Sequence, residues 1–447
     1  MCVGFLALLS EAHAQDSDWK VGLARVKITP TEPVRMAGYG SRDHASNGVA
    51  SELHAKALAI EDRNGQRAVI VTSDVIGFTA AFAEPVCRRI AERTGLDRSR
   101  ILLNSSHTHT GPTLSLDDDE AEGFTREDTA ATVRYTRRLQ DTLVDLVVRS
   151  FKGLEPARLS RGVGVAPFVM NRREFTERGV VLGFNPRGHI DRSVPILRVN
   201  TPDGKMRAVL YGAACHNTTL TGRHYEISGD FAGYSQVLIE REHPGAQAMF
   251  MQGCAGDANP HPRGSEAFAR QHGDTLGREV MRILGAELRP VRGPLRIAFK
   301  RVALPLQPAP SRSQLDRWAK GGGWRGFVGK QMTAWLEREG ALPTTYTAPF
   351  TVWQFGGDLT LVGLPGEVVV DYVTLIEKAL GPRRLWVAAY CNDVFGYLPS
   401  AKVLSEGGYE TRGLYSGGIG FFTAQAQDVA TAAVLEMARI VGRPMAR

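Results

Sequence analysis

The amino-acid sequence predicts an α/β fold, because strand-like and helix-like stretches alternate along nearly the whole chain. Its 447 residues are 43% hydrophobic and 23% charged, with 48 Gly and 23 Pro. These values are ordinary for a folded globular protein and exclude disordered, collagen-like and coiled-coil chains. A chain of this length can bury a large core, and we expect one or two domains.

The elements follow one another in a regular order through the first 260 residues. Strands are predicted at 21–29, 53–60, 68–73, 101–104, 194–199, 207–213 and 248–252, with a turn at 63–66. A helix is predicted from about residue 81 to 93. A second, amphipathic helix is marked by an apolar stripe of Leu139, Leu143, Val144, Leu146 and Val147.

The last third of the chain continues the pattern. It predicts a hairpin around 356–358, a strand at 359–363, a helix at 369–380, a strand at 384–390 and a helix at 422–440. Before them, the Pro-rich segment 307–311 indicates a connector, and the three glycines at 321–323 indicate a flexible turn. We therefore predict one domain over residues 15–447, with a minor subdomain or lid near 306–345.

The first residues differ from the rest. Positions 2–9 form a short apolar run, and Ala12, His13 and Ala14 follow as a small-x-small pattern that a signal peptidase could cut before Gln15. We predict a signal peptide over residues 1–14 and a secreted or periplasmic product. The basic stretch that normally precedes the apolar run is missing, so the signal would be truncated; a simple N-terminal tail is the alternative.

Charge and hydropathy limit the partners. The 54 basic and 47 acidic residues give a formal net charge of +7, and the Lys and Arg are scattered rather than gathered into a nucleic-acid-binding arm. No stretch reaches the ~18 to 20 continuous apolar residues of a membrane span. We therefore expect no nucleic-acid partner, and any contact with lipid would be peripheral.

The five cysteines are too few for a disulfide framework in a chain of this size. Cys2 would be lost on processing, and we expect Cys87, Cys215, Cys254 and Cys391 to be buried as small hydrophobic side chains. A bridge between Cys215 and Cys254 is the alternative in an oxidising compartment.

Five polar segments directly follow predicted strands. They are residues 105–112, 215–219, 252–261, 364–367 and 391–397. Sites in open α/β sheets lie where strands end, so these segments can converge at one edge of a sheet. Together they supply side chains that bind metal ions or transfer protons, namely His107, His109, His216, Asp257, Glu367 and Tyr397.

Each candidate also has a simpler interpretation. His107 and His109 project to the same side of a loop, but such pairs also occur as surface polar groups. His216 could be a hydrogen-bonded core histidine, Glu367 could cap the following helix, and Tyr397 could pack in a turn. Convergence of the segments favours instead a catalytic zinc site, in which three N/O ligands leave a position open for water.

The sequence resembles the neutral ceramidases, also called alkaline or non-lysosomal ceramidases, in several segments that occur in the same order. The matching segments are residues 22–30 (GLARVKITP), 36–39 (MAGY), 107–112 (HTHTGP), 171–172 (NR), 227–230 (ISGD), 233–234 (GY), 255–257 (AGD), 365–367 (PGE) and 408–410 (GYE). Members of this family are secreted zinc amidases that cleave the amide bond of N-acyl sphingoid bases. The resemblance implies mixed sheets with flanking helices in a ceramidase-like metallohydrolase domain.

The resemblance also implies roles for individual residues. The family's zinc ligands fall on His107, His216, Glu367 and Tyr397, so Zn²⁺ is the expected cofactor. His109 matches a second active-site histidine, and Arg172 matches an arginine on the substrate side. We expect catalysis to involve His109, Asp257, Asn259 and Tyr397, and substrate binding to involve Arg172 and His261.

The chain departs from the family in two respects. Where the family reads Gly-Asp-Val-Ser-Pro-Asn, residues 256–261 read Gly-Asp-Ala-Asn-Pro-His, so Asn259 replaces a serine sometimes given a nucleophilic role. A mechanism that needs the serine is excluded, whereas attack by zinc-activated water is retained, with Asn259 orienting the water or donating to the oxyanion. The sequence also ends soon after the predicted helix 422–440, without a counterpart of the family's C-terminal immunoglobulin-like domain.

We therefore predict a secreted zinc-dependent amidohydrolase acting on ceramide-like lipids or related N-acyl amines. Zinc-activated water would attack the carbonyl, Asp257 or His109 would relay the proton, and Tyr397 would serve as ligand or oxyanion donor. One alternative is a zinc-dependent esterase, lactonase or phosphoesterase on the same fold. Another is a binding protein that retains zinc without catalysis, because Asn259 replaces a catalytic-looking residue.

Overall fold

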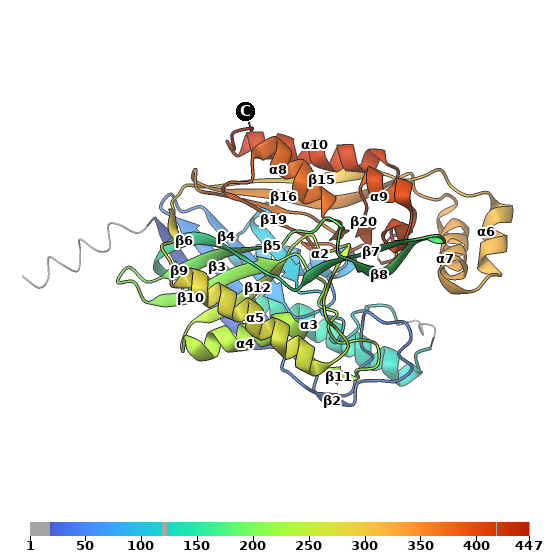
Figure 1. The fold of residues 1–447 in the computed structure, drawn as a ribbon, viewed down its shortest axis with the longest axis horizontal. Coiled ribbons are helices and arrows are strands. Elements are labelled where there is room, and N and C mark those ends of the chain that lie inside the picture. Colours follow the sequence, from blue (N-terminus) through green and yellow to red (C-terminus); the bar gives the residue numbers. More distant parts are fainter. Residues whose placement is uncertain (1–17, 119–122, 417, 447) are drawn as a thin grey trace, which may run out of the picture.

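The computed structural model describes residues 18–118, 123–416 and 418–446. The signal peptide predicted over residues 1–14 lies outside the described residues. Two large sheets lie face to face, and helices cover both outer faces, as Figure 1 shows. The larger sheet contains parallel and antiparallel pairs, so the predicted α/β fold with mixed sheets and flanking helices is confirmed.

The larger sheet contains nine strands within the described residues, in the order β12-β10-β9-β6-β1-β3-β4-β5, with β14 beside β6. Their bounds are β1 (Trp19–Lys27), β3 (His54–Asp62), β4 (Arg67–Ser73), β5 (Ile101–Ser105), β6 (Glu155–Val165), β9 (Ser193–Asn200), β10 (Met206–Ala213), β12 (Gln247–Gln252) and β14 (Arg289–Val291). The pairs β4–β5 and β10–β12 are parallel, and both lie at the edges of the sheet.

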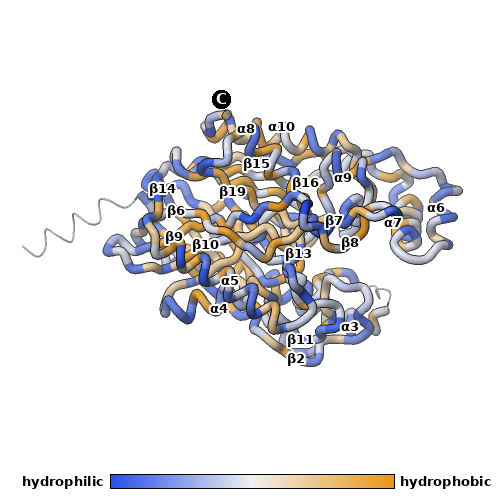
Figure 2. Tube along the Cα trace, viewed as in Figure 1, coloured by the Kyte–Doolittle hydropathy of each residue, from blue (hydrophilic) through white to orange (hydrophobic). Residues whose placement is uncertain are grey.

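The smaller sheet contains β15 (Leu295–Pro305), β16 (Thr345–Phe355), β17 (Leu359–Gly363) and β19 (Leu385–Ala388). Its inner face packs on the larger sheet through large buried side chains, among them Trp19, Leu58, Trp353 and Trp386. Each such side chain stabilises the fold by about 1.5–3 kcal/mol through removal of its apolar surface from water. Figure 2 shows the apolar residues concentrated along the strands of the two sheets.

Helices complete the outer layers. The larger sheet is covered by α2 (Ala80–Thr94), α3 (Arg126–Lys152), α4 (Asp230–Glu242) and α5 (Glu266–Leu284), and the smaller sheet by α8 (Asp371–Leu380) and α10 (Gln425–Ile440). The predicted stripe of α3 is buried, and a capping box between Thr125 and Asp128 defines where this helix begins. In the described parts of the chain, no helix has both the length and the apolar character needed to cross a membrane.

The structure also contains several shorter elements. They are β2 (Gly48–Val49), β11 (Glu226–Ile227), β7 (Val169–Thr176), β8 (Gly179–Asn185), β13 (Ala258–Pro260), β18 (Glu367–Val368), β20 (Tyr397–Leu398), α9 (Ala401–Glu406) and the 3-10 helices η1 (Arg98–Arg100) and η2 (Tyr409–Arg412). The segment 306–345 contains α6 (Arg312–Ala319) and α7 (Gly323–Glu339), which pack on each other and extend beyond the sheets in Figure 1. A lid role for this segment stays a prediction.

The two edges of the larger sheet approach each other because the sheet is strongly curved. Asn104, in β5, accepts a hydrogen bond from the backbone N–H of Gln252, in β12, at 2.9 Å. The Gln252 side chain in turn donates to the carbonyls of Ser106 (3.1 Å) and Cys215 (2.8 Å). The loops that follow β5, β10 and β12 are therefore brought to one place.

The structure corrects several element boundaries. The strand predicted at 384–390 ends at Ala388, the helix predicted at 422–440 begins at Gln425, and Gly323 of the predicted turn already belongs to α7. Cys87, Cys215, Cys254 and Cys391 are buried and free, as expected for small hydrophobic side chains. The alternative bridge between Cys215 and Cys254 is not formed among the described residues.

Candidate metal centre

Three histidines from distant parts of the chain meet at the curved end of the larger sheet. His107 and His109 follow β5, and His216 follows β10; each offers a ring nitrogen within 4.8 Å of those of the others. Glu367, in β18, joins them with its Oε2 2.8 Å from Nε2 of His216 and 3.0 Å from Nε2 of His107. His107, His216 and Glu367 are almost completely buried.

The orientation of His107 and His216 is determined by backbone carbonyls. Nδ1 of His107 donates to the carbonyl of Ile76 at 2.5 Å, and Nδ1 of His216 donates to that of Ala255 at 2.6 Å. Both rings turn their Nε2 atoms toward Glu367. Metal-binding histidines are typically oriented by such contacts.

The charges in this site follow from the pKa values of His216 and Glu367. Burial, together with the charge of Arg172, lowers the pKa of His216 to about 4. Burial alone would raise the pKa of Glu367, but the neighbouring His107 and His216 outweigh it and hold that pKa well below its usual range. Glu367 is therefore ionised at neutral pH.

The donor set fits a divalent cation. Nε2 of His107, Nε2 of His216 and Oε2 of Glu367 converge in a buried site, and a divalent cation could accept electron pairs from all three. Tetrahedral ligands about 2.0–2.1 Å from zinc lie about 3.3 Å from one another, close to the 2.8 and 3.0 Å separations found here. Two histidines and one carboxylate are a ligand set of catalytic zinc sites that keep a position open.

Two tyrosines hold the carboxylate in place. Tyr415 donates to Oε1 of Glu367, and Tyr390 donates to Oε2 at 3.3 Å. Burial raises the pKa of both hydroxyl groups well above the usual value, so both stay protonated and can donate. The sequence analysis missed both residues, and spacing offered no signal because Tyr415 lies 48 residues beyond its partner.

His109 lies beside the other ligands but is held differently. Its Nε2 is 3.1 Å from Nε2 of His107, and its buried Nδ1 has no hydrogen-bond partner among the described residues. Burial, followed by the charges of the other two histidines, lowers its pKa well below the usual value. Its ring packs edge-on against Tyr39 and so close to Gly38 that a Cβ there would lie 2.4 Å from the ring. Gly38 also has a positive φ of 90°, which favours glycine.

Tyr397 is placed next to Glu367 by backbone pairing, since β18 and β20 are parallel with these two residues in register. Its hydroxyl group accepts a hydrogen bond from Nη2 of Arg172 at 2.9 Å. The same guanidinium donates to Glu410 (2.9 Å) and to Asn259 (3.4 Å). Glu410 is buried and also pairs with Arg173 at 2.6 Å; the sequence analysis gave it no role.

The remaining candidates lie around these groups. Asp257 is buried, and its carboxylate accepts from the backbone N–H of Val370 (2.8 Å) and from Asn171 (3.3 Å). Burial raises its pKa to about 7. Asn259 accepts from Thr218 at 3.1 Å, and the ring of His261 packs against Phe184 at the surface.

Two cavities open onto the histidines. A cavity of about 540 Å³ reaches His107, His109, Glu367 and Tyr397 and is otherwise lined largely by apolar side chains, including Met36, Leu114, Phe124, Phe327 and Val394. A second cavity of about 400 Å³ contains Arg172, Asn259 and His261 and shares His109 and Tyr397 with the first. Asp257 is not one of the described residues that line these two cavities.

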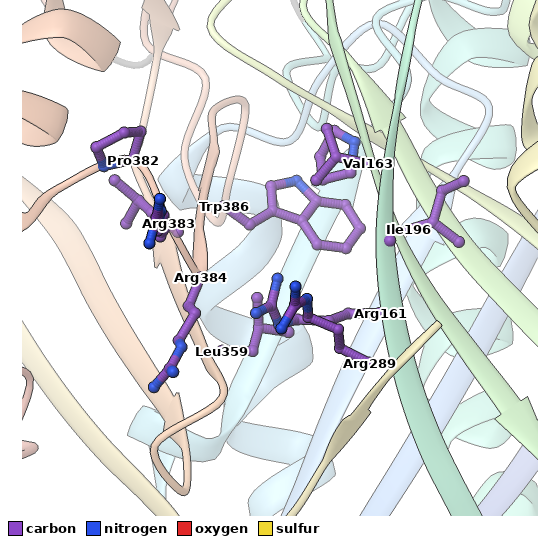
Figure 3. Close-up of a pocket in the computed structure, with 12 residues that line it drawn as sticks. Arg161, Val163, Ile196, Arg289, Leu359, Pro382, Arg383, Arg384 and Trp386 are labelled. Atoms are coloured by element: carbon purple, nitrogen blue, oxygen red, sulfur yellow. The ribbon is translucent and has the colours of Figure 1, made fainter. Parts of the chain in front are cut away.

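A third cavity, of about 440 Å³, is shown in Figure 3. It is surrounded by Arg161, Arg289, Arg383, Arg384 and Trp386. The described residues that line it include no histidine and no carboxylate. This cavity therefore offers no ligands to a metal cation.

Comparison with known proteins agrees with the fold. The sequence model described as neutral/alkaline non-lysosomal ceramidase, N-terminal, matches residues 19–275. This region is more than half of the chain, and the chain belongs to this family. The matched region includes His107, His109 and His216 and ends before Glu367 and Tyr397.

The matches to individual relatives span only part of the length of each relative. The chain is 27% identical to the neutral ceramidase of Pseudomonas aeruginosa over 276 residues, which are 58% of this chain and 39% of that protein. It is 23% identical to neutral ceramidase A of Dictyostelium discoideum, over 56% of this chain and 37% of the relative. The chain thus spans about two fifths of the length of these curated relatives.

Solved structures match over a larger share. The crystal structure of neutral ceramidase from Pseudomonas aeruginosa superposes with a TM-score of 0.71 over 95% of this chain and 74% of that chain, at 21% identity. A structure titled ceramidase complexed with C2 gives 0.72 over 97% and 77%, at 20% identity. These likenesses establish the shared fold.

Proposed function

We propose that this protein is a zinc-dependent amidohydrolase that cleaves the amide bond of N-acyl substrates, either ceramide-like lipids or related N-acyl amines. The observation that carries the proposal is the convergence of the Nε2 atoms of His107 and His216 on Oε2 of Glu367, at 3.0 and 2.8 Å, in a buried site. Family membership and the names of the relatives, which are neutral ceramidases, support the amide as the bond that is cleaved.

Zinc would be held by His107, His216 and Glu367, with Tyr397 as a fourth ligand or as a donor to the oxyanion. When bound, zinc lowers the pKa of a water molecule and polarises a carbonyl group. The Arg172 contact supports the donor role, because a positive charge beside the hydroxyl of Tyr397 favours donation toward developing negative charge.

We propose that His109 transfers the proton between the attacking water and the leaving amine. Its ring lines both cavities, and its unpartnered Nδ1 and its Nε2 can exchange a proton between water and the leaving amine. Asp257 is the alternative relay. Because its carboxylate holds the backbone just after β18, its contacts favour a positioning role for the strand that carries Glu367.

Substrate binding is assigned to Arg172 and His261, which line the second cavity. Asn259 occupies the position of the family serine, and its side-chain oxygen accepts from both Arg172 and Thr218. We propose that it orients the guanidinium of Arg172. The apolar lining of the first cavity suits the acyl chain.

Export to the periplasm or the outside of the cell belongs to the same proposal. It rests on the apolar run and small-x-small pattern at residues 2–14. Mass spectrometry of the protein recovered from a periplasmic or culture fraction would test it. A mature N-terminus at Gln15 supports export, and a chain that stays in the cytoplasm with its first residues intact contradicts it.

The hydrolytic function is tested with purified protein by combining elemental analysis with an assay for sphingosine released from N-lauroylsphingosine. We expect bound zinc, and we expect turnover to be abolished in His107→Ala and Glu367→Gln. His243→Ala, at the C-terminal end of α4, is the matched control and should retain activity. Full activity in both ligand variants with depleted zinc would refute the assignment, and preferential cleavage of the ester analogue would favour the esterase alternative.

A further inference from the structure

The two cavities that meet at the histidines differ in chemical character. Both are bordered by Gly38, Tyr39, His109, Tyr397 and Tyr409, so a substrate cleaved at the histidines would extend into both. The larger cavity combines largely apolar walls with the carboxylate of Glu367 and with two arginines, Arg35 and Arg42. Arg35 lies 3.9 Å from Asp128, and Arg42 donates hydrogen bonds to the carbonyls of Ala37, His109 and His224. The smaller cavity is lined by two arginines, and the described residues that line it include no aspartate or glutamate.

The two arginines of the smaller cavity are not equivalent. Arg172 forms an ion pair with the buried carboxylate of Glu410 at 2.9 Å. Arg263 forms no ion pair among the described residues, and its buried Nε has no hydrogen-bond acceptor there. A half-buried guanidinium with a desolvated, unsatisfied N–H group is unfavourable unless an anion approaches it.

The hydrogen bond that the Arg263 side chain forms within the described residues does not neutralise its charge. Nη2 of Arg263 donates to the hydroxyl group of Tyr39 at 2.9 Å. Burial raises the pKa of Tyr39 to about 12, so this hydroxyl is neutral at physiological pH. Arg263 therefore brings a positive charge that no described carboxylate pairs with to the wall of the smaller cavity.

We propose that the substrate of this site carries a carboxylate on its amine side, bound by Arg263, so that the preferred substrates are N-acyl amino acids rather than neutral ceramides. This inference rests on the hydrolase function proposed above. In the reaction, the C–N bond of the amide breaks, the oxygen of water joins the acyl carbon, and its protons are shared between the products. A fatty acid and a free amino acid are formed.

The other walls of the smaller cavity fit the rest of an amino acid. Met170, Leu182 and Phe184 provide apolar surface for its side chain. Asn259 and His261, two positions at which residues 256–261 depart from the family pattern, also line this cavity. A single unpaired guanidinium matches one carboxylate, because its planar fork can donate two parallel hydrogen bonds to the two oxygens.

The experiment compares N-lauroyl-phenylalanine with its neutral alcohol, N-lauroyl-phenylalaninol, by the lauric acid released from each. We expect wild-type protein to prefer the carboxylate. In Arg263→Gln, the ratio of the two kcat/KM values should fall about 10- to 100-fold, as expected for loss of a charged hydrogen bond. Arg263→Lys should restore part of the ratio. Arg289→Gln makes the same charge change in β14, at the far end of the molecule in Figure 2, and should leave the ratio unchanged.

Other outcomes separate this inference from the function on which it rests. If wild type prefers the alcohol, or if Arg263→Gln slows both substrates equally, the carboxylate site is overturned while the hydrolase function stands. If neither amide is cleaved, the hydrolase function fails. Calorimetric binding of N-lauroyl-phenylalanine to wild type and Arg263→Gln then tests the site alone, and equal affinities overturn it.

Discussion

Removal of the buried carboxylate of Glu410 should destabilise the protein strongly. Glu410 accepts hydrogen bonds from Arg172 at 2.9 Å and from Arg173 at 2.6 Å, and its side chain and both guanidinium groups are at most 5% exposed. In Glu410→Gln the two arginines lose their shared negative charge, and the new amide N–H₂ faces other donors. Leaving buried charges without their partner typically costs about 3–5 kcal/mol.

The expected change in melting temperature follows from the size of the chain. At about 2.1 cal/mol/K per residue, 447 residues give an unfolding entropy of about 0.9 kcal/mol/K. A loss of about 3–5 kcal/mol therefore lowers the melting temperature by about 3–5 °C. Arg172 would also lose one of the contacts that hold it against Tyr397, so activity should fall as well.

Scanning calorimetry at one scan rate and one pH is the appropriate assay. Glu337→Gln is the control, because Glu337 pairs with Arg312 at 2.8 Å on the surface, where both side chains are more than half exposed. Exposed pairs contribute about 0–1 kcal/mol, so this variant should melt within about 1 °C of wild type. If Glu410→Gln melts as high as Glu337→Gln, the reasoning about uncompensated buried charge is wrong.

Three further changes probe the surroundings of the candidate metal centre. Tyr415→Phe removes the hydroxyl that supports Glu367 and should weaken zinc binding about 10- to 100-fold in a chelator competition; unchanged affinity would exclude that support. Gly38→Ala places a Cβ about 2.4 Å from the ring of His109 and should lower kcat, so a wild-type kcat would contradict the close contact. Burial raises the pKa of Asp257 from 3.8 to about 7, so the folded protein binds this proton more tightly than the unfolded chain does. The stability that this proton contributes is fully present below about pH 4 and should be lost as the pH rises to about 7. Calorimetry across this range should therefore show a weaker pH dependence of the melting temperature in Asp257→Asn than in wild type. Parallel curves for the two proteins would contradict this prediction.

The local pattern of apolar and turn residues was sufficient to predict many of the strands and helices. The strand predicted at 359–363 is β17 (Leu359–Gly363), and the predicted strands at 68–73 and 101–104 differ from β4 and β5 by one residue. These segments have a strong apolar pattern with turn residues at their ends, and such signals lie within a few neighbouring residues. The same signals placed His107 and His216 just after strands.

Helices with weaker local signals were not predicted. Both α4 and α5 were missed, and α5 contains Gly273 and Gly277, which ordinarily weaken a helix. In the structure these glycines lie against Tyr234 and Leu238 of α4, where a Cβ would come within 2.8 Å of the opposing side chain. Close packing of the two helices thus requires residues that the sequence pattern disfavours.

By itself, the sequence determined the types of element, their order, and the chemistry of the side chains that follow the strands. Only the tertiary structure decided which of those side chains meet. The Asn104–Gln252 contact that brings the sheet edges together joins residues 148 positions apart, and the Arg172–Glu410 pair spans 238 positions. The periodicity of a segment indicates which of its residues are buried, but not which other segments bury them. The curvature of the sheet, in contrast, depends on the packing of all its strands together. That Arg263 has no ion pair among the described residues is likewise visible only in the tertiary structure, which places their carboxylates.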